Sequence, residues 1–152
     1  MKAEVMFLKA LRCESDVVAK AMSNLGLLYN TRGNYLAQTG DMNGAQKAAN
    51  DAVRYLEEGK ARLDALMSDG KLDSQLQEYA SRYRPLRLQS HKLIGQLHAG
   101  AGDMVACEAE FRQATESFPD DAFAWQALSR ALEMQGKVDE AKQAVEKAQL
   151  LR

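Results

Sequence analysis

The chain has 152 residues, 46% of them apolar, and its 20 basic and 21 acidic side chains leave a formal net charge of -1. This length suits one domain over residues 1–152 with a continuous core, and the balanced charge excludes recognition of nucleic acid or anionic membranes through an overall field. With 2 prolines and few aromatic residues among many Ala, Leu, Gln, Lys and Glu, the composition favours helices over strands and predicts an all-α fold.

The first predicted element is a short helix over residues 2–12, interpreted as the second helix of a hairpin whose first helix is missing. Under this interpretation the chain is a fragment of a longer solenoid, and self-association through an apolar face of Val5, Met6 and Leu8 is an alternative. Charged residues interrupt the segment, and no apolar run reaches the roughly 20 residues that cross a bilayer, so we expect a cytoplasmic protein without a membrane partner. The interpretation as a second helix depends on the small-large-small spacing of Ala3, Phe7 and Ala10. This spacing is the same as that of Cys107, Phe111 and Ala114 later in the chain.

A long antiparallel hairpin is predicted next, over residues 16–67. Ser15 and Asp16 cap its first helix, which runs to residue 39 with Gly33 inside it at a cost of roughly 1 kcal/mol relative to Ala. A turn follows at Gly40 and Asp41. The returning helix, 42–67, has small residues at helical spacing: Ala45, Ala49 and Ala52.

Residues 72–87 are predicted to form an irregular or kinked helix. They begin a helical pattern that reaches residue 99 and contains Pro85, which either kinks a helix or divides it into two. Basic residues around this proline are an alternative site for an acidic partner or nucleic acid, although the neutral overall charge argues against nucleic acid: Arg82, Arg84, Arg87 and Lys92.

The remainder contains two copies of a 34-residue pattern, assigned to residues 88–121 and 122–152. Each copy is predicted to be a helix, a short turn and a second helix, and Pro119 and Asp121 lie in the turn between the copies. Small residues allow close helix approach, and Phe111, Trp125 and Val145 are expected to fill the space between hairpins. The matched positions are His91, Ile94, His98, Gly102, Cys107, Phe111 and Ala114 with Trp125, Leu128, Leu132, Gly136, Ala141, Val145 and Ala148.

These residues resemble the tetratricopeptide repeat. The resemblance lies in Trp125-x2-Leu128 followed by Gly136-Lys137-Val138-Asp139-Glu140-Ala141, with Gly95, Ala114 and Pro119 in the earlier copy. It implies a right-handed superhelix of antiparallel helical hairpins, with elongated helices in the first half of this chain. It also implies a concave surface lined by the first helix of each hairpin.

The resemblance also implies which residues line that concave groove. The stripe is rich in amides and mildly basic, which suits the backbone of an extended peptide and a carboxylate of an acidic side chain or C-terminus. An ordinary polar solvent face is the alternative. The stripe contains Asn30, Asn34, Gln89, Lys92, Gln96, Phe123, Gln126, Arg130 and Glu133.

Catalytic and metal-binding constellations are not expected. His91 and His98 are seven residues apart, too far for the i, i+4 pair of a helical zinc site, and a third ligand is missing. Cys13 and Cys107 lack the spacing of a metal or redox motif and a basic neighbour that would activate a nucleophile, which favours a reducing compartment. We therefore predict no enzyme activity, no cofactor and no metal.

The sequence thus predicts a non-catalytic scaffold that binds a partner peptide or helix in its concave groove. Two other functions are open. One is a chaperone-like domain that shields an apolar partner segment, for which Leu27 and Phe123 argue. The other is a regulatory or oligomerisation segment of a larger protein, for which the orphan helix over residues 2–12 argues.

Overall fold

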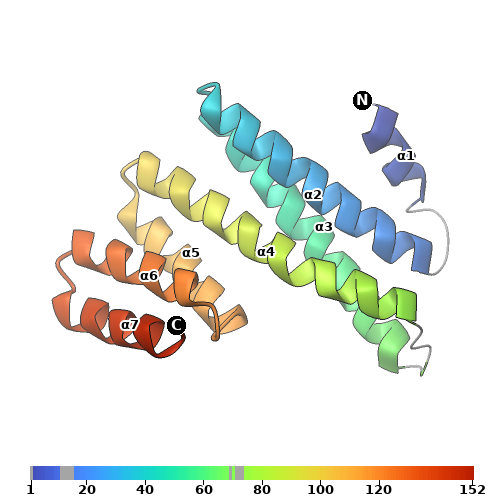
Figure 1. Cartoon of the computed structure of the whole chain (residues 1–152). Helices are drawn as coiled ribbons and strands as arrows, with labels where there is room; N and C mark the ends of the chain where they lie inside the picture. The colour runs from blue at the N-terminus through green and yellow to red at the C-terminus, as the bar shows by residue number, and fades with distance from the viewer. Residues whose placement is uncertain (1, 11–15, 69, 71–73) are drawn as a thin grey trace. The chain divides into compact units, whose positions relative to one another are not determined.

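The computed structural model describes residues 2–10, 16–68, 70 and 74–152, and within these ranges it contains helices and turns but no strand. The predicted all-α fold is confirmed (Figure 1). The described helices are α1 (Lys2–Ala10), α2 (Asp16–Gln38), α3 (Met42–Ser68), α4 (Ser74–Gly100), α5 (Met104–Ser117), α6 (Ala122–Met134) and α7 (Val138–Leu150).

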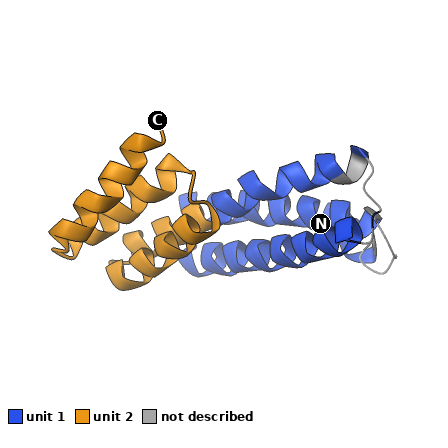
Figure 2. Ribbon diagram, turned by 90° about the horizontal axis from the view of Figure 1, so that it is seen from below, with its two compact units in different colours: residues 1–90 blue, residues 91–152 orange. Residues whose placement is uncertain are grey.

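The chain forms two compact units, residues 1–90 and residues 91–152 (Figure 2). The first contains α1, α2, α3 and most of α4. The second contains the end of α4 and the three shorter helices α5, α6 and α7.

In the first unit, α2 and α3 form the long antiparallel hairpin that the sequence predicts. Helix α2 continues through Gly33 without interruption. The turn uses Gly40 at a φ of 90°, a conformation that favours glycine, and Asp41 Oδ1 accepts a 2.9 Å hydrogen bond from the amide of Gly44. The elongated helices expected in the first half of the chain are therefore confirmed.

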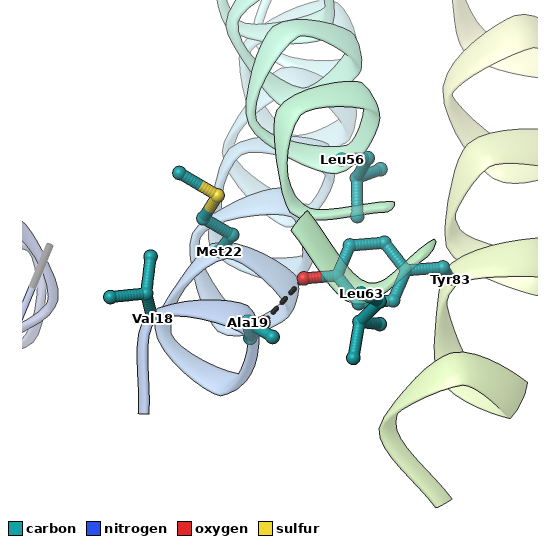
Figure 3. Close-up of a cluster of buried hydrophobic side chains, with 6 residues drawn as sticks. All are labelled: Val18, Ala19, Met22, Leu56, Leu63 and Tyr83. Carbon is teal, nitrogen blue, oxygen red and sulfur yellow. Dashed lines mark hydrogen bonds between the residues drawn. The ribbon is translucent and has the colours of Figure 1, made fainter. Parts of the chain in front are cut away.

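Small residues let α2 and α3 approach closely. A Cβ at Gly26 would lie 2.3 Å from Leu56 Cδ2, so the glycine makes room for a leucine that is fully buried. The hydroxyl of Tyr83, on α4, donates a hydrogen bond to the carbonyl oxygen of Ala19 on α2 (Figure 3). Burial raises the pKa of this phenol, which therefore stays protonated and able to donate. The buried cluster contains Val18, Ala19, Met22, Leu56, Leu63 and Tyr83.

Helix α1 contacts α2. Phe7 packs against the cluster of Leu25 and Tyr29, and Tyr29 donates a 2.6 Å hydrogen bond to Glu4. The expected apolar face is present, because Val5, Met6 and Leu8 are exposed. Residues 11–12 of the predicted helix lie outside the described residues, and self-association through this face stays a prediction.

Helix α4 is continuous through Pro85. Of the two alternatives for Pro85, the division into two helices is therefore wrong, whereas a kink stays a prediction. Residues 74–87 are helical, and 72 and 73 lie outside the described residues. A buried polar contact with α2 stabilises this part of the helix. Asn30 donates a 3.0 Å hydrogen bond to the carbonyl oxygen of Leu86 and accepts one of 2.8 Å from the Ser90 hydroxyl.

Replacing Asn30 with Ala is expected to lower the free energy of unfolding by about 2 kcal/mol, because it removes both bonds and leaves Ser90 buried without its amide partner. Urea unfolding followed by tyrosine fluorescence measures this, since all 5 tyrosines lie in residues 1–90. Asn43→Ala, at an exposed position of α3, is the control and should change stability by less than about 0.5 kcal/mol. Equal effects of the two variants would contradict the role of the buried amide.

In the second unit, two helical hairpins follow one another. Gly102 and Gly136 take φ values of 78° and 75° in their turns, and Asp103 and Asp121 cap α5 and α6 through hydrogen bonds of 3.0 and 2.8 Å. A Cβ at Gly95 would lie 2.4 Å from Phe111 Cζ, so the ring packs directly on the α4 backbone. Small residues of α5 and α7 are buried as predicted: Cys107, Ala114, Ala141 and Ala148.

The three large residues expected between hairpins differ in how far they are buried. Phe111 is buried, whereas Trp125 and Val145 are only half-buried. The Trp125 indole N–H donates a 2.9 Å hydrogen bond to the carbonyl oxygen of Pro119, and the ammonium of Lys147 lies 4.3 Å from the ring centroid. Trp125 therefore anchors the turn before α6 instead of filling the space between hairpins.

A buried carboxylate joins the two hairpins of this unit. Glu108, on α5, accepts hydrogen bonds of 2.7 Å from Lys137 Nζ and 2.7 Å from Gln135 Nε2, which lie between α6 and α7 in the next hairpin. Arg112 donates a 2.8 Å bond to the same carboxylate and also pairs with Glu140. These contacts lower the pKa of Glu108 to about 2, with the hydrogen bond from Lys137 as the largest cause.

Candidate functional site

The second unit contains an open cavity of about 670 Å³, which we call the C-terminal cavity. Helices α4, α5, α6 and α7 all contribute to its lining. Its apolar lining includes Gly95, Ala99, Met104, Cys107, Phe111, Phe123, Met134, Val145 and Ala148. Its polar lining includes Gln96, Gln126, Ser129, Arg130, Glu133, Gln149 and Arg152.

This lining combines an apolar base with polar groups at the mouth. Cys107 and Phe111 are buried, whereas Gln96, Arg130 and Arg152 are exposed. Burial raises the pKa of the Cys107 thiol, with the charges of Asp103 and Glu110 adding to the effect, so the thiol is a neutral wall of the cavity. Such a surface accepts apolar side chains and presents amides and two guanidinium groups to polar or acidic groups.

Five residues of the predicted stripe line the C-terminal cavity: Gln96, Phe123, Gln126, Arg130 and Glu133. Lys92 lies beside it, with its ammonium 3.9 Å from the centroid of the Phe123 ring. This contact is a cation–π interaction, so Lys92 holds the aromatic ring in place at the mouth.

The other three residues of the predicted stripe belong to the first unit. Asn30 is 0% exposed and bonded to α4, so its expected place on an exposed stripe is wrong. Asn34 is half-buried and donates a 3.0 Å hydrogen bond to the backbone oxygen of Asn30. Gln89 is half-buried. A binding role for Asn34 and Gln89 stays a prediction.

Sequence reasoning missed the contribution of α5 and α7. Met104, Val145, Gln149 and Arg152 line the cavity although they lie on or after second helices, which the repeat pattern places away from the concave side. The repeat gave no signal for α7, because Val145 and Gln149 repeat the positions of Phe111 and Thr115, which are buried, whereas Val145 is half-buried and Gln149 exposed.

A smaller cavity of about 250 Å³ lies between α5, α6 and α7, and its lining includes Arg112, Trp125, Glu140 and Lys147. Its charged groups already have partners. Arg112 pairs with Glu108 and Glu140, and Lys147 lies over Trp125. We therefore interpret this smaller cavity as part of the packing between hairpins and not as a binding site.

His91 and His98 do not form a metal site with each other in the described chain. His91 is buried, and its Nδ1 lies 2.6 Å from Glu110 Oε1, while its ring packs edge-on against Phe118. Among the described residues, no group of three or more His, Cys, Asp or Glu is placed to hold a metal ion. No helix in the described ranges has the length and apolar character that spanning a bilayer requires.

Part of the second unit matches a known family. Residues 110–143 match the family model described as tetratricopeptide repeat. No curated protein matches the sequence. Among solved structures, MamA AMB-1 is 15% identical, with a TM-score of 0.41, and the alignment covers 84% of this chain and 99% of that chain. A mutant of MamA is 16% identical, with a TM-score of 0.39 and coverages of 84% and 97%.

The match spans one repeat length, from the middle of α5 through α6 to the middle of α7. Repeats of this type stack into surfaces that bind other proteins. Residues 110–143 of this chain are therefore similar in sequence to one tetratricopeptide repeat.

Proposed function

We propose that this protein is an interaction scaffold that binds a segment of a partner protein in the C-terminal cavity. The observation that carries the proposal is the combination, in one open cavity of about 670 Å³, of an apolar base and a polar mouth. A cavity of this volume lies within the range of about 300–1,000 Å³ that is typical of specific binding sites. It accepts one or two side chains of a peptide or helix.

The charges at the mouth favour an acidic segment or a C-terminal carboxylate. Arg130 and Arg152 are exposed, and neither guanidinium pairs with a carboxylate among the described residues, whereas Glu133 is the one acidic residue in the described lining. Exposed guanidinium groups bind carboxylates through paired hydrogen bonds. Gln96 and Gln126 add amide donors and acceptors that match a peptide backbone.

The triple variant Gln96→Ala, Gln126→Ala, Arg130→Ala tests this proposal in affinity capture of partner proteins. We expect capture to fall by about tenfold or more, because three of the polar groups at the mouth are removed while the apolar base stays intact. The matched control is Gln77→Ala, Gln113→Ala, Arg62→Ala, which changes the same residue types at exposed positions outside the cavity. Equal capture by both variants would contradict the proposed site.

Shielding of an apolar segment is a second candidate function. Met104 and Met134 line the same cavity, and methionine side chains adapt to varied apolar partners. The two functions differ in their response to salt. Recognition of a carboxylate by Arg130 and Arg152 weakens as ionic strength rises, whereas apolar shielding does not.

A further inference from the structure

At the mouth of the C-terminal cavity, the side chain of Lys92 covers an aromatic ring. Its ammonium lies over the ring of Phe123, 3.9 Å from the centroid, which is direct contact with the ring face. Phe123 lines the cavity and is 40% exposed although it is a large apolar residue. The ring is therefore part of the surface that a bound segment meets.

The position of Lys92 follows from helix geometry. Lys92 and Gln96 are one turn apart on α4, so both side chains leave the same face of the helix, and Gln96 lines the cavity. On α6, Arg130 follows Phe123 by two turns, about 10 Å at the usual rise per residue. The mouth therefore has two cations spaced along it, Lys92 beside Phe123 and Arg130 farther along α6.

An exposed aromatic ring at this place would attract cations if Lys92 did not cover it. The face of a phenyl ring has a negative potential, and it binds ammonium and guanidinium groups within about 6 Å of its centroid. With Lys92 in place this face is occupied, and a cation of a ligand would approach a like charge. Lys92 pairs with no carboxylate in the described part of the chain, so its charge is not cancelled there.

We propose that Lys92 determines the charge specificity of the C-terminal cavity. By covering the face of Phe123, it excludes basic segments and favours acidic ones. The inference rests on the proposed function and deepens it, because it assigns the choice of ligand charge to a residue that lies beside the cavity lining. In the proposed function Gln96, Gln126 and Arg130 contribute affinity, whereas Lys92 contributes discrimination.

Two small probes of similar shape and opposite charge test this inference on the whole chain of 152 residues. The probes are phenylpropionate and phenylpropylammonium. Each has a phenyl ring for the apolar base of the cavity and a charged group for its mouth, and amide chemical shifts in NMR titrations measure both affinities. We expect the native chain to bind phenylpropionate at least about tenfold more tightly than phenylpropylammonium.

Lys92→Ala removes the charge and uncovers the ring. We expect it to raise the affinity for phenylpropylammonium by about threefold or more, because the face of Phe123 becomes free, and to lower the affinity for phenylpropionate. Lys92→Arg should keep the native preference, and adding Phe123→Leu to Lys92→Ala should abolish the gain. The matched control is Lys20→Ala, which removes an ammonium from over the Tyr79 ring in the first unit and should change neither affinity.

A gain of affinity for one probe separates this role from a structural one, since loss of a residue that only supports the ring weakens the binding of both probes. Equal changes for the two probes in Lys92→Ala, or a gain that persists after Phe123→Leu, would overturn the inference and leave the proposed function standing. If the native chain binds neither probe and the lining residues show no shifts, the cavity itself is not a binding site and the inference fails with it.

Discussion

Replacing Glu108 with Gln is expected to lower the free energy of unfolding of the second unit by about 2 kcal/mol at pH 7. The carboxylate is 9% exposed and accepts bonds from three side chains, on two hairpins. The variant leaves Lys137 and Arg112 without their shared anion. Their side chains are 42% and 44% exposed, so water replaces part of the lost interaction and keeps the loss below the value for a fully buried pair.

Urea unfolding followed by the fluorescence of Trp125 measures this effect, because the chain has 1 Trp and it lies in the second unit. Glu116→Gln, an exposed position of the same helix, is the matched control and should change stability by less than about 0.5 kcal/mol. A loss equal to that of the control would show that Glu108 does not hold the hairpins together.

The contribution of Glu108 is also expected to depend on pH. Its pKa is about 2 in the folded chain against an ordinary value of 4.5, so the folded state binds this proton more weakly than the unfolded state does. A lowered pKa means that the stabilisation is fully present above about pH 5 and is lost as the pH falls toward 2. The stability difference between the native chain and Glu108→Gln should therefore shrink over this range and stay constant from pH 6 to 8.

The helix order and the main turns could be predicted because their signals are local. Gly40 with Asp41, Gly102 with Asp103, and Gly136 each combine a left-handed glycine with a helix start within a few residues. The 34-residue spacing of small and large residues likewise depends only on the helices themselves. The assignment of residues 88–121 and 122–152 as repeats stays a prediction, since the family match covers 110–143.

The exposure of polar residues could not be predicted in the same way. Asn30 has the composition and spacing of a groove residue, yet its burial depends on α4 lying against it, a contact between positions about 60 apart in the sequence. The effect of Pro85 was predicted from a local rule, since a proline removes a hydrogen bond of its own helix. The contacts that keep α4 continuous, such as the hydrogen bond of Asn30 with Leu86, join positions far apart in the sequence and could not be predicted. Five residues of the predicted stripe line the C-terminal cavity, whereas its lining residues on α5 and α7 do not follow from the repeat pattern.

Replacing Gly59 with Ala is expected to lower the free energy of unfolding of the first unit by about 2–4 kcal/mol. The new Cβ would lie 2.1 Å from the hydroxyl oxygen of Tyr83 and 2.7 Å from its ring. Tyr83 is 2% exposed and donates its hydroxyl to Ala19, so it has no free space to move into without losing that bond. The loss thus combines overpacking with a broken buried hydrogen bond.

A double-mutant cycle with Tyr83→Phe tests this explanation, with urea unfolding followed by circular dichroism as the measurement. Removing the hydroxyl relieves the shortest contact, so Gly59→Ala should cost at least about 1 kcal/mol less in the Tyr83→Phe background. Gly100→Ala is the control for helix propensity, because nothing lies within 4 Å of its Cβ position, and it should be neutral or slightly stabilising. Additive effects of Gly59→Ala and Tyr83→Phe would place the strain elsewhere than at this contact between α3 and α4, and the packing of α4 on the long hairpin would then need another anchor.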